Sequence, residues 1–234
     1  VETSSFRQTM SLQSSASSVS LASSAPPSGW TPQQFQQAYN VPASLNGKPA
    51  GYGVKVAVIT AYHYSNMQAD LNKFAAQYSL KPITLNIINQ AGSNTNTNWS
   101  LQSNLSVQMI NAISPGATVY VIEAKSNNDV VNFPAASPDV VAVGGTTPNS
   151  VSPLVESAWG ETGAGMSVYE SMPSYQVSAV QKANTTAFRS VPDLVFNADP
   201  SYGARIYSSI AGGWLGFGGT SVSSTLFAGA VAIA

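Results

Sequence analysis

The sequence contains no cysteine and very little charge. The absence of cysteine from all 234 residues excludes a disulfide framework and any thiolate metal site. Charged residues make up 8% of the chain, the net charge is −1 and the basic residues form no cluster. A typical soluble domain carries about 25% charged residues. A partner recognised mainly by its negative charge, such as nucleic acid or an anionic membrane, is therefore excluded.

Few carboxylates also means few groups that change charge as the pH falls. Acid unfolding comes largely from the protonation of paired carboxylates, so a chain with only 10 acidic residues is well suited to an acidic, extracellular setting. No apolar run reaches the roughly 18 residues of a membrane helix. The chain starts at Val1 without a basic-then-apolar leader, and we expect a processed product or a fragment that is secreted and monomeric.

The composition divides the chain into two parts. Residues 1–30 are rich in serine and end in "SSASSVSLASSAPPSGW", which is typical of a linker or the remnant of a prosegment. Residues 31–234 have the composition of one folded domain, and the length allows a sizeable core. The domain opens with a short expected helix that Thr31 caps, that has Pro32 in its first turn and that ends near Tyr39.

Strand-like and helix-like segments then alternate. The runs 53–62 and 83–89 are typical of strands, and 67–80 and 98–114 have apolar residues at helical spacing. Later strands are expected in "ATVYVIEA", "DVVAVGGTT", "PDLVFNAD", "ARIYSS" and "WLGFGGT", followed by a helix in "SVSSTLFAGAVAIA". This order predicts an α/β domain with a mainly parallel sheet flanked by helices. We expect Val54–Ile59, Val119–Ile122 and Val140–Val143 at the centre of that sheet, and a buried helix beginning at or just after Ser221.

Ser221 stands in "GFGGTSVSSTLFAGA", where a glycine pair precedes the apolar helical run. The free N–H groups and the dipole of a helix N-terminus favour negative charge, as on the oxyanion of acyl transfer. A serine there can thus be a nucleophile, but it can also simply cap the helix. The tetrapeptide alone favours the cap, and the chain has a single histidine, His63, to offer as a base.

Longer stretches of the sequence favour the nucleophile interpretation of Ser221 over the helix-cap interpretation. In order along the chain come "FQQAYNVP", "GYGVKVAVITAY", "ADLNKFAAQYSL", "ISPGATVYVIEAKSNN", "FPAASPDVVAVGGTT", "ESAWGETGAGMSVYESMPSYQ", "VPDLVFNADPSYGARIY" and "GGWLGFGGTSVSS". Together they resemble the sedolisin family of serine-carboxyl peptidases, over most of residues 33–234. The resemblance implies a subtilisin-like fold and a secreted acid endopeptidase acting on polypeptides.

The resemblance also implies which residues form the site. Ser221 takes the position of the nucleophile. The family's base is a glutamate with an aspartate four residues later, in a motif that matches "WSLQSNLS" here. Gln102 stands at the glutamate position and Ser106 at the aspartate position. An amide oxygen accepts a hydrogen bond but is not a useful base at ordinary pH, so we expect impaired hydrolysis.

Two further family features depart from the pattern. The family's oxyanion-side aspartate precedes the "FPAASP" stretch, where Asp129 is the only acidic candidate. The segment around it is far shorter than in the family, so a strand–helix–strand portion of the sheet is expected to be missing. The family's calcium site lies beyond the active serine. Because the chain ends at Ala234, truncated at its C-terminus relative to the family, we expect no metal and no other cofactor.

The remaining candidates have both structural and functional interpretations. Gly163 and Gly165 line a substrate cleft or form an ordinary turn. A general base at His63 is the weaker interpretation of that residue, and Asp70 is expected on a helix surface or behind the site. Two further sets are interpreted as structural: the hydrogen-bonding acids Glu123, Glu156, Asp193 and Asp199, and the core or cleft-wall aromatics Trp159, Tyr169 and Trp214. The rival to an impaired peptidase is a non-catalytic homologue that binds a peptide or serves as a scaffold.

Overall fold

We analysed a computed structural model that describes residues 29–125, 137–177 and 188–233. Helix α1 spans Pro32–Ala38, and its N-cap Thr31 forms a full capping box with Gln34. The expected start and end of this helix are confirmed. Most of the expected linker, residues 1–28, lies outside the described residues, and so does the interpretation of Asp129.

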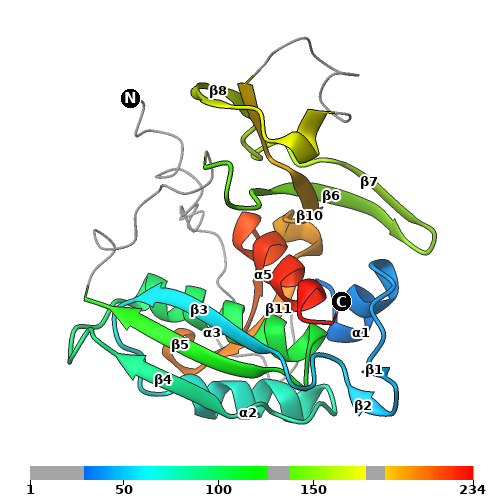
Figure 1. Cartoon of the computed structure of the whole chain (residues 1–234). Helices are drawn as coiled ribbons and strands as arrows, with labels where there is room; N and C mark the ends of the chain where they lie inside the picture. The colour runs from blue at the N-terminus through cyan, green and yellow to red at the C-terminus, as the bar shows by residue number, and fades with distance from the viewer. Residues whose placement is uncertain (1–28, 126–136, 178–187, 234) are drawn as a thin grey trace.

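The first half of the domain alternates strands and helices as expected. A two-residue hairpin pairs β1 (Ser44–Leu45) with β2 (Lys48–Pro49). The elements that follow are β3 (Lys55–Ala61), α2 (Met67–Gln77), β4 (Leu85–Asn89), α3 (Thr97–Ile113) and β5 (Thr118–Ala124). Strands β3, β5 and β4 lie in that order in an all-parallel sheet, with β5 in the middle. Figure 1 shows α2 and α3 on one side of this sheet.

The second half is richer in strands. It comprises β6 (Val143–Val151), β7 (Leu154–Ala158), β8 (Gly165–Ser171), β9 (Phe188–Val191), β10 (Leu194–Asn197), β11 (Ala204–Ser208) and β12 (Gly213–Phe217). Short 3-10 turns, η1 (Ser174–Gln176), η2 (Pro200–Tyr202) and η3 (Ser209–Ala211), connect them. Strand β6 pairs in parallel with β10 and antiparallel with β7, whereas β8–β9 and β11–β12 are antiparallel pairs.

The expected position of Val140–Val143 is wrong. Of these four residues only Val143 lies in a strand, and that strand, β6, pairs with β10 and β7 rather than with β3 or β5. An apolar run predicts that a strand will be buried, but it does not determine which strands lie beside it. Strands β3 and β5 pair as expected, with Val56 opposite Val119.

The C-terminal helix α5 spans Thr220–Val231, so it begins one residue before the expected start at Ser221. Its N-cap is Gly219, whose φ of 103° is in a region that residues with a side chain rarely adopt. The expected cap role of Ser221 is therefore taken by a glycine. The C-terminal half packs on α3, where Gly229 lies against Ile113 and Ser114 Oγ donates to Gly229 O.

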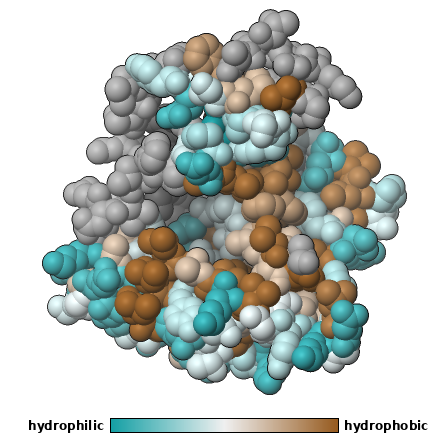
Figure 2. Space-filling view, viewed as in Figure 1, coloured by the Kyte–Doolittle hydropathy of each residue, from teal (hydrophilic) through white to brown (hydrophobic). Residues whose placement is uncertain are grey.

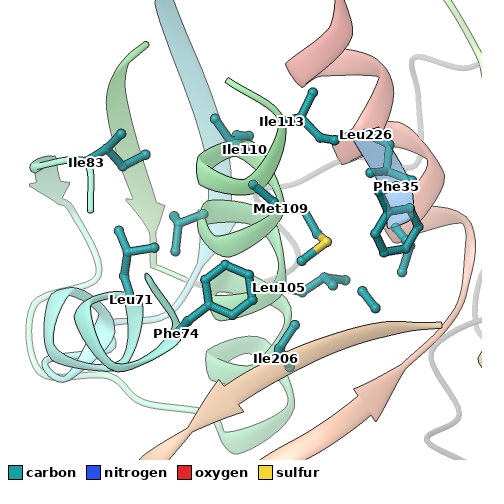
Figure 3. Packing of buried hydrophobic residues seen from close by; sticks show 14 of the residues in the cluster. Phe35, Leu71, Phe74, Ile83, Leu105, Met109, Ile110, Ile113, Ile206 and Leu226 are labelled. Atoms are coloured by element: carbon teal, nitrogen blue, oxygen red, sulfur yellow. The ribbon is translucent and has the colours of Figure 1, made fainter. Parts of the chain in front are cut away.

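Helix α3 is the centre of the core. It contacts α1, α2, α5, β3 and β11, and Figure 3 shows its apolar residues surrounded by side chains from the neighbouring elements. The labelled residues of this cluster come from five elements and one loop, and all are at most 6% exposed: Phe35, Leu71, Phe74, Ile83, Leu105, Met109, Ile110, Ile113, Ile206 and Leu226. Within the described residues, none of the helices has the length and apolar character needed to span a bilayer.

Candidate active site

Ser221 lies in the first turn of α5, at the second helical position. Its side chain is half-buried, and among the described residues no group hydrogen-bonds to its Oγ atom. The backbone oxygen of Ser221 accepts from Thr225 Oγ1 at 2.6 Å and from Ser224 Oγ at 3.2 Å. The hydroxyl of Ser221 thus remains available at the positive end of the helix dipole.

Glycines shape the turn that leads into α5. A Cβ atom on Gly218 would lie 2.5 Å from Pro200 Cγ, and one on Gly145 would lie 2.5 Å from Ala198 Cβ. Both contacts are too close for any side chain, so the chain can run against β6 and the η2 turn only because these residues are glycine. The Gly219 N–H donates to Ala198 O at 2.6 Å and fixes the end of the turn.

The segment containing Gly163 and Gly165 is attached to the same region. Thr162 Oγ1 accepts from Gly145 N at 2.8 Å, and Trp159 N donates to Gly145 O at 3.1 Å. Gly145 in turn lies beside Thr220, whose Cγ2 atom would be 3.5 Å from an added Cβ. Both glycines are exposed, with open space where a Cβ atom would stand. Their role as a cleft wall stays a prediction.

Gln102 and Ser106 stand out on α3. Every residue from Ser100 to Ile113 is buried except these two, which are half-buried. Residues four apart share a helix face, so Gln102 and Ser106 lie on the same face of α3. Ser106 Oγ donates to the backbone oxygen of Gln102 at 3.0 Å, and neither side chain bonds to Ser221 in the described residues. That the two side chains point towards Ser221 stays a prediction.

Both Ser106 and Ser221 lie towards the N-termini of their helices from the contact between α3 and α5. The close contact between α3 and α5 joins Ile113 and Gly229. Ser106 lies seven residues before Ile113, and Ser221 lies eight residues before Gly229. At about 1.5 Å per residue, each hydroxyl is roughly 10–12 Å along its helix from this contact.

Asp70 belongs to a buried network that positions α3. Its side chain is 2% exposed, so the expected place on a helix surface is wrong. Asp70 Oδ2 accepts from Tyr64 Oη at 2.5 Å, from Asn104 Nδ2 at 2.9 Å and from Ser209 N at 3.0 Å. The pKa of Tyr64 is raised, first by burial and then by its hydrogen bond to Asp70. Asn104 is one of several buried polar residues of α3, so the local sequence does not single it out as part of this network.

His63 pairs with Glu123 at the carboxyl ends of β3 and β5. His63 Nδ1 lies 2.7 Å from Glu123 Oε2, and Glu123 Oε1 accepts from Tyr64 N at 3.0 Å. The carboxylate is fully buried and the imidazole is 27% exposed. Beside this pair, Thr60 Oγ1 lies 2.6 Å from Ser103 Oγ, which links β3 to α3.

The other acids are held by hydrogen bonds as well. Glu156 accepts from Tyr39 and Thr146, and the half-buried Tyr39 has a raised pKa because of desolvation and the nearby Glu156 charge. Burial alone would raise the pKa of Asp199, but hydrogen bonds from Ser201 and Thr147 outweigh it and lower that pKa.

Asp193 pairs with the fully buried Arg189 at 2.8 Å. Burial would raise the pKa of Asp193, but donors from Arg189, Ala142 N and Gln176 lower it.

The three aromatic residues that were expected in the core or in a cleft wall differ in exposure. Trp159 is 8% exposed and Trp214 packs on Tyr78 and Tyr207. Tyr169 is 85% exposed, so a core position is wrong for this residue, and a place in a cleft wall stays a prediction.

Metal ligands are not gathered anywhere in the described part of the chain. No group of three or more His, Asp or Glu side chains there is close enough to share an ion. The expectation that the family's calcium site is absent stays a prediction.

The arrangement as a whole is a subtilisin-like α/β fold with a serine at the start of a buried helix. Its fold matches that of Pseudomonas sedolisin, a serine-carboxyl proteinase solved in complex with two molecules of pseudo-iodotyrostatin. The TM-score is 0.71 at 24% sequence identity, and the match covers 89% of this chain and 80% of that one. The expected fold class is confirmed.

Curated proteins show the same relationship in sequence, although no family model matches the chain. Sedolisin from Pseudomonas sp. (strain 101) is 42% identical over 112 residues, covering 42% of this chain and 18% of that protein. Kumamolisin from Bacillus sp. (strain MN-32) is 40% identical over 114 residues, covering 44% of this chain and 20% of that protein. Xanthomonalisin from Xanthomonas sp. (strain T-22) is 37% identical over 122 residues, covering 44% and 14%.

The aligned part of the chain thus spans between 14% and 20% of the length of these relatives. The resemblance to the sedolisin family is confirmed in sequence over these segments, and the fold is that of a solved sedolisin.

Proposed function

We propose that the chain is a serine-carboxyl peptidase domain of the sedolisin type in which the peptide-binding site is retained and hydrolysis is impaired. One observation carries the proposal. The Ser221 hydroxyl at the N-terminus of α5 has no hydrogen-bond partner among the described residues, and the only two residues of α3 between Ser100 and Ile113 that are not buried are Gln102 and Ser106. The positions of the family's nucleophile and its two carboxylates are thus the ones left accessible.

The proposed chemistry follows from what each position can do. Ser221 would attack the scissile carbonyl of a polypeptide, and the backbone N–H groups at the start of α5 would stabilise the oxyanion. Gln102 cannot accept the hydroxyl proton, because a neutral amide oxygen is not a base. Loss of a triad member costs several powers of ten in turnover, although a pre-formed oxyanion site retains part of the rate.

A second function is favoured by the same two residues. With both carboxylates replaced, the site suits a non-catalytic protein that holds a peptide without cutting it. We further propose an extracellular, monomeric protein without a bound metal. This rests on the low carboxylate content and the 8% share of charged residues.

The experiment is a peptide-hydrolysis assay on the chain between about pH 3 and 7, with Ser221→Ala as the matched variant. We expect little or no turnover, and a covalent serine probe that labels the chain but not the variant. Rapid cleavage near pH 4 that Ser221→Ala abolishes would refute the impairment. Absence of both labelling and peptide binding would refute the retained site.

A further inference from the structure

The first turn of α5 is tied to the end of β10 by hydrogen bonds to three consecutive backbone oxygens. Ser223 Oγ lies 2.7 Å from Phe196 O and 3.0 Å from Asn197 O. Gly219 N, at the N-cap, donates to Ala198 O at 2.6 Å. A serine hydroxyl has one proton, so Ser223 donates to either of its two acceptors or shares the proton between them.

Ser223 differs from the other hydroxyl residues that follow Ser221. Ser224 Oγ and Thr225 Oγ1 both donate to Ser221 O within α5, which is the usual bond of such side chains inside a helix. Ser223 instead donates to another element, and it is 0% exposed. Figure 2 shows mainly hydrophobic residues in the middle of the molecule, where Figure 1 places α5. Water therefore offers this hydroxyl no alternative partner.

The end of β10 that accepts these bonds is held in place by other elements. Asn197 N donates to Tyr39 Oη at 2.6 Å, just beyond α1, and Asn197 Nδ2 donates to Tyr202 O at 2.7 Å in η2. Ala198 N donates to Thr146 O of β6 at 2.9 Å. The acceptors of Ser223 thus have a fixed position that does not depend on α5.

Ser223 and Ser221 are two residues apart in the same helix. At 3.6 residues per turn their side chains are separated by roughly 200° around the helix axis, so they point to nearly opposite sides. A bond that holds Ser223 against β10 therefore sets the rotation of the first turn, and with it the direction of Ser221.

From this geometry we propose that Ser223 is a positioning residue for Ser221. Its bond to the end of β10 fixes the rotation and the height of the first turn of α5, and so aims the Ser221 hydroxyl. The inference rests on the proposed function, in which that hydroxyl attacks a carbonyl. Misplacement of a reacting group by about 1 Å can cost on the order of 100-fold in rate.

The test compares two variants of the full chain. Ser223→Ala should slow the labelling of Ser221 by a fluorophosphonate probe at least about tenfold. Ser114→Ala is the matched control, because Ser114 is also 0% exposed and donates to Gly229 O at the other end of α5. Each variant loses one buried hydroxyl bond, so both should lower the urea midpoint to a similar extent. Only Ser223→Ala should change the labelling rate.

Amide hydrogen exchange gives a second readout that needs no chemistry at Ser221. The Gly219 N–H is the informative amide, because its bond to Ala198 O closes the same contact with β10. We expect Gly219 to exchange at least about tenfold faster in Ser223→Ala than in Ser114→Ala, through local opening of the first turn. The amides of α3 report global unfolding and should respond alike in both variants.

The proposal is overturned if Ser223→Ala is labelled as fast as the original chain, or if Ser114→Ala slows labelling equally. It is also overturned if Gly219 exchanges at the same rate in both variants. If the probe labels none of the three chains, the expected reactivity of Ser221 is refuted, and the exchange of Gly219 alone decides whether Ser223 positions this turn.

Discussion

Ser221 and Gln102 differ in what they retain of acyl-transfer chemistry. Ser221 keeps both requirements of its position, a hydroxyl to which no described residue hydrogen-bonds and a helix N-terminus beneath it. Gln102 keeps only the position, since its amide has the length of a glutamate but cannot bind and release a proton near neutral or acid pH. Compared with a glutamate, Gln102 thus lacks the ionisable carboxylate but keeps the length of the side chain.

Restoring both carboxylates should therefore raise activity. With Gln102→Glu and Ser106→Asp together, we expect faster peptide hydrolysis and an optimum in acid, where a carboxylate of pKa near ~4 still acts as a base. Turnover is measured against pH with the single variants alongside. If the double variant is no faster than the original chain, a feature outside this pair limits the reaction.

Asp70 offers a second test on a single residue. Replacing it by alanine removes the shared acceptor of Tyr64 Oη, Asn104 Nδ2 and Ser209 N and leaves a gap in the buried network. Tyr64 Oη then keeps Ser209 Oγ as a partner, and Asn104 Nδ2 keeps Ser208 Oγ. We expect Asp70→Ala to lower the free energy of unfolding by about 2–4 kcal/mol, measured by urea titration. The exposed Asp139→Ala serves as control and should stay within about 0.5 kcal/mol. An equal effect of both variants would contradict a structural role for the network.

The contact between α3 and α5 decides how two elements of the site lie together. Gly229 is in the interior of α5, where alanine would normally be preferred by about 1 kcal/mol. An added Cβ atom would nevertheless lie 2.8 Å from both Cβ and Cγ2 of Ile113. The helices must then move apart or strain, and Ile113 Cβ is fixed by its own backbone.

We expect Gly229→Ala to destabilise the chain by about 1–3 kcal/mol in spite of its better helix propensity. Thermal unfolding checks this, with Ala228→Gly as a control that should lose about 1 kcal/mol through propensity alone. A gain in stability from Gly229→Ala would mean that the two helices separate easily. The position of Ser221 along α5 relative to Ser106 on α3 would then not be fixed by the contact between Gly229 and Ile113.

At the scale of the whole molecule, the ion pair of Asp193 and Arg189 connects stability to pH. Burial opposes the charge on Asp193, but its donors hold its pKa below the ordinary value. A depressed carboxyl pKa contributes stability that is fully present above the unfolded pKa of about 3.9 and is lost as the pH falls through the folded pKa. The pair thus remains ionised further into acid than an unpaired aspartate.

We therefore expect the free energy of unfolding to fall as the pH drops below about 4, and Asp193→Asn to make that fall shallower. Urea titrations at several pH values between about 3 and 7 measure the slope. Asp139→Asn is the matched control and should keep the original slope. If Asp193→Asn leaves the slope unchanged, other carboxylates dominate the acid response.

Much of the fold and of the candidate site follows from local sequence. Periodicity predicts α2, α3, β3 and β5, because burial of one face or of a whole strand repeats at fixed spacing along the chain. Thr31 and Pro32 predict the start of α1, since capping involves only neighbouring residues. The order of motifs places Ser221, Gln102 and Ser106 before any coordinates are considered.

Tertiary structure alone decided the rest. Asp70 is buried because Ser209, far along the chain, supplies a donor to it, and no local pattern encodes that meeting. Val143 joins β10 rather than β5 because strand pairing depends on non-local backbone hydrogen bonds, which the same apolar run can make with several partners.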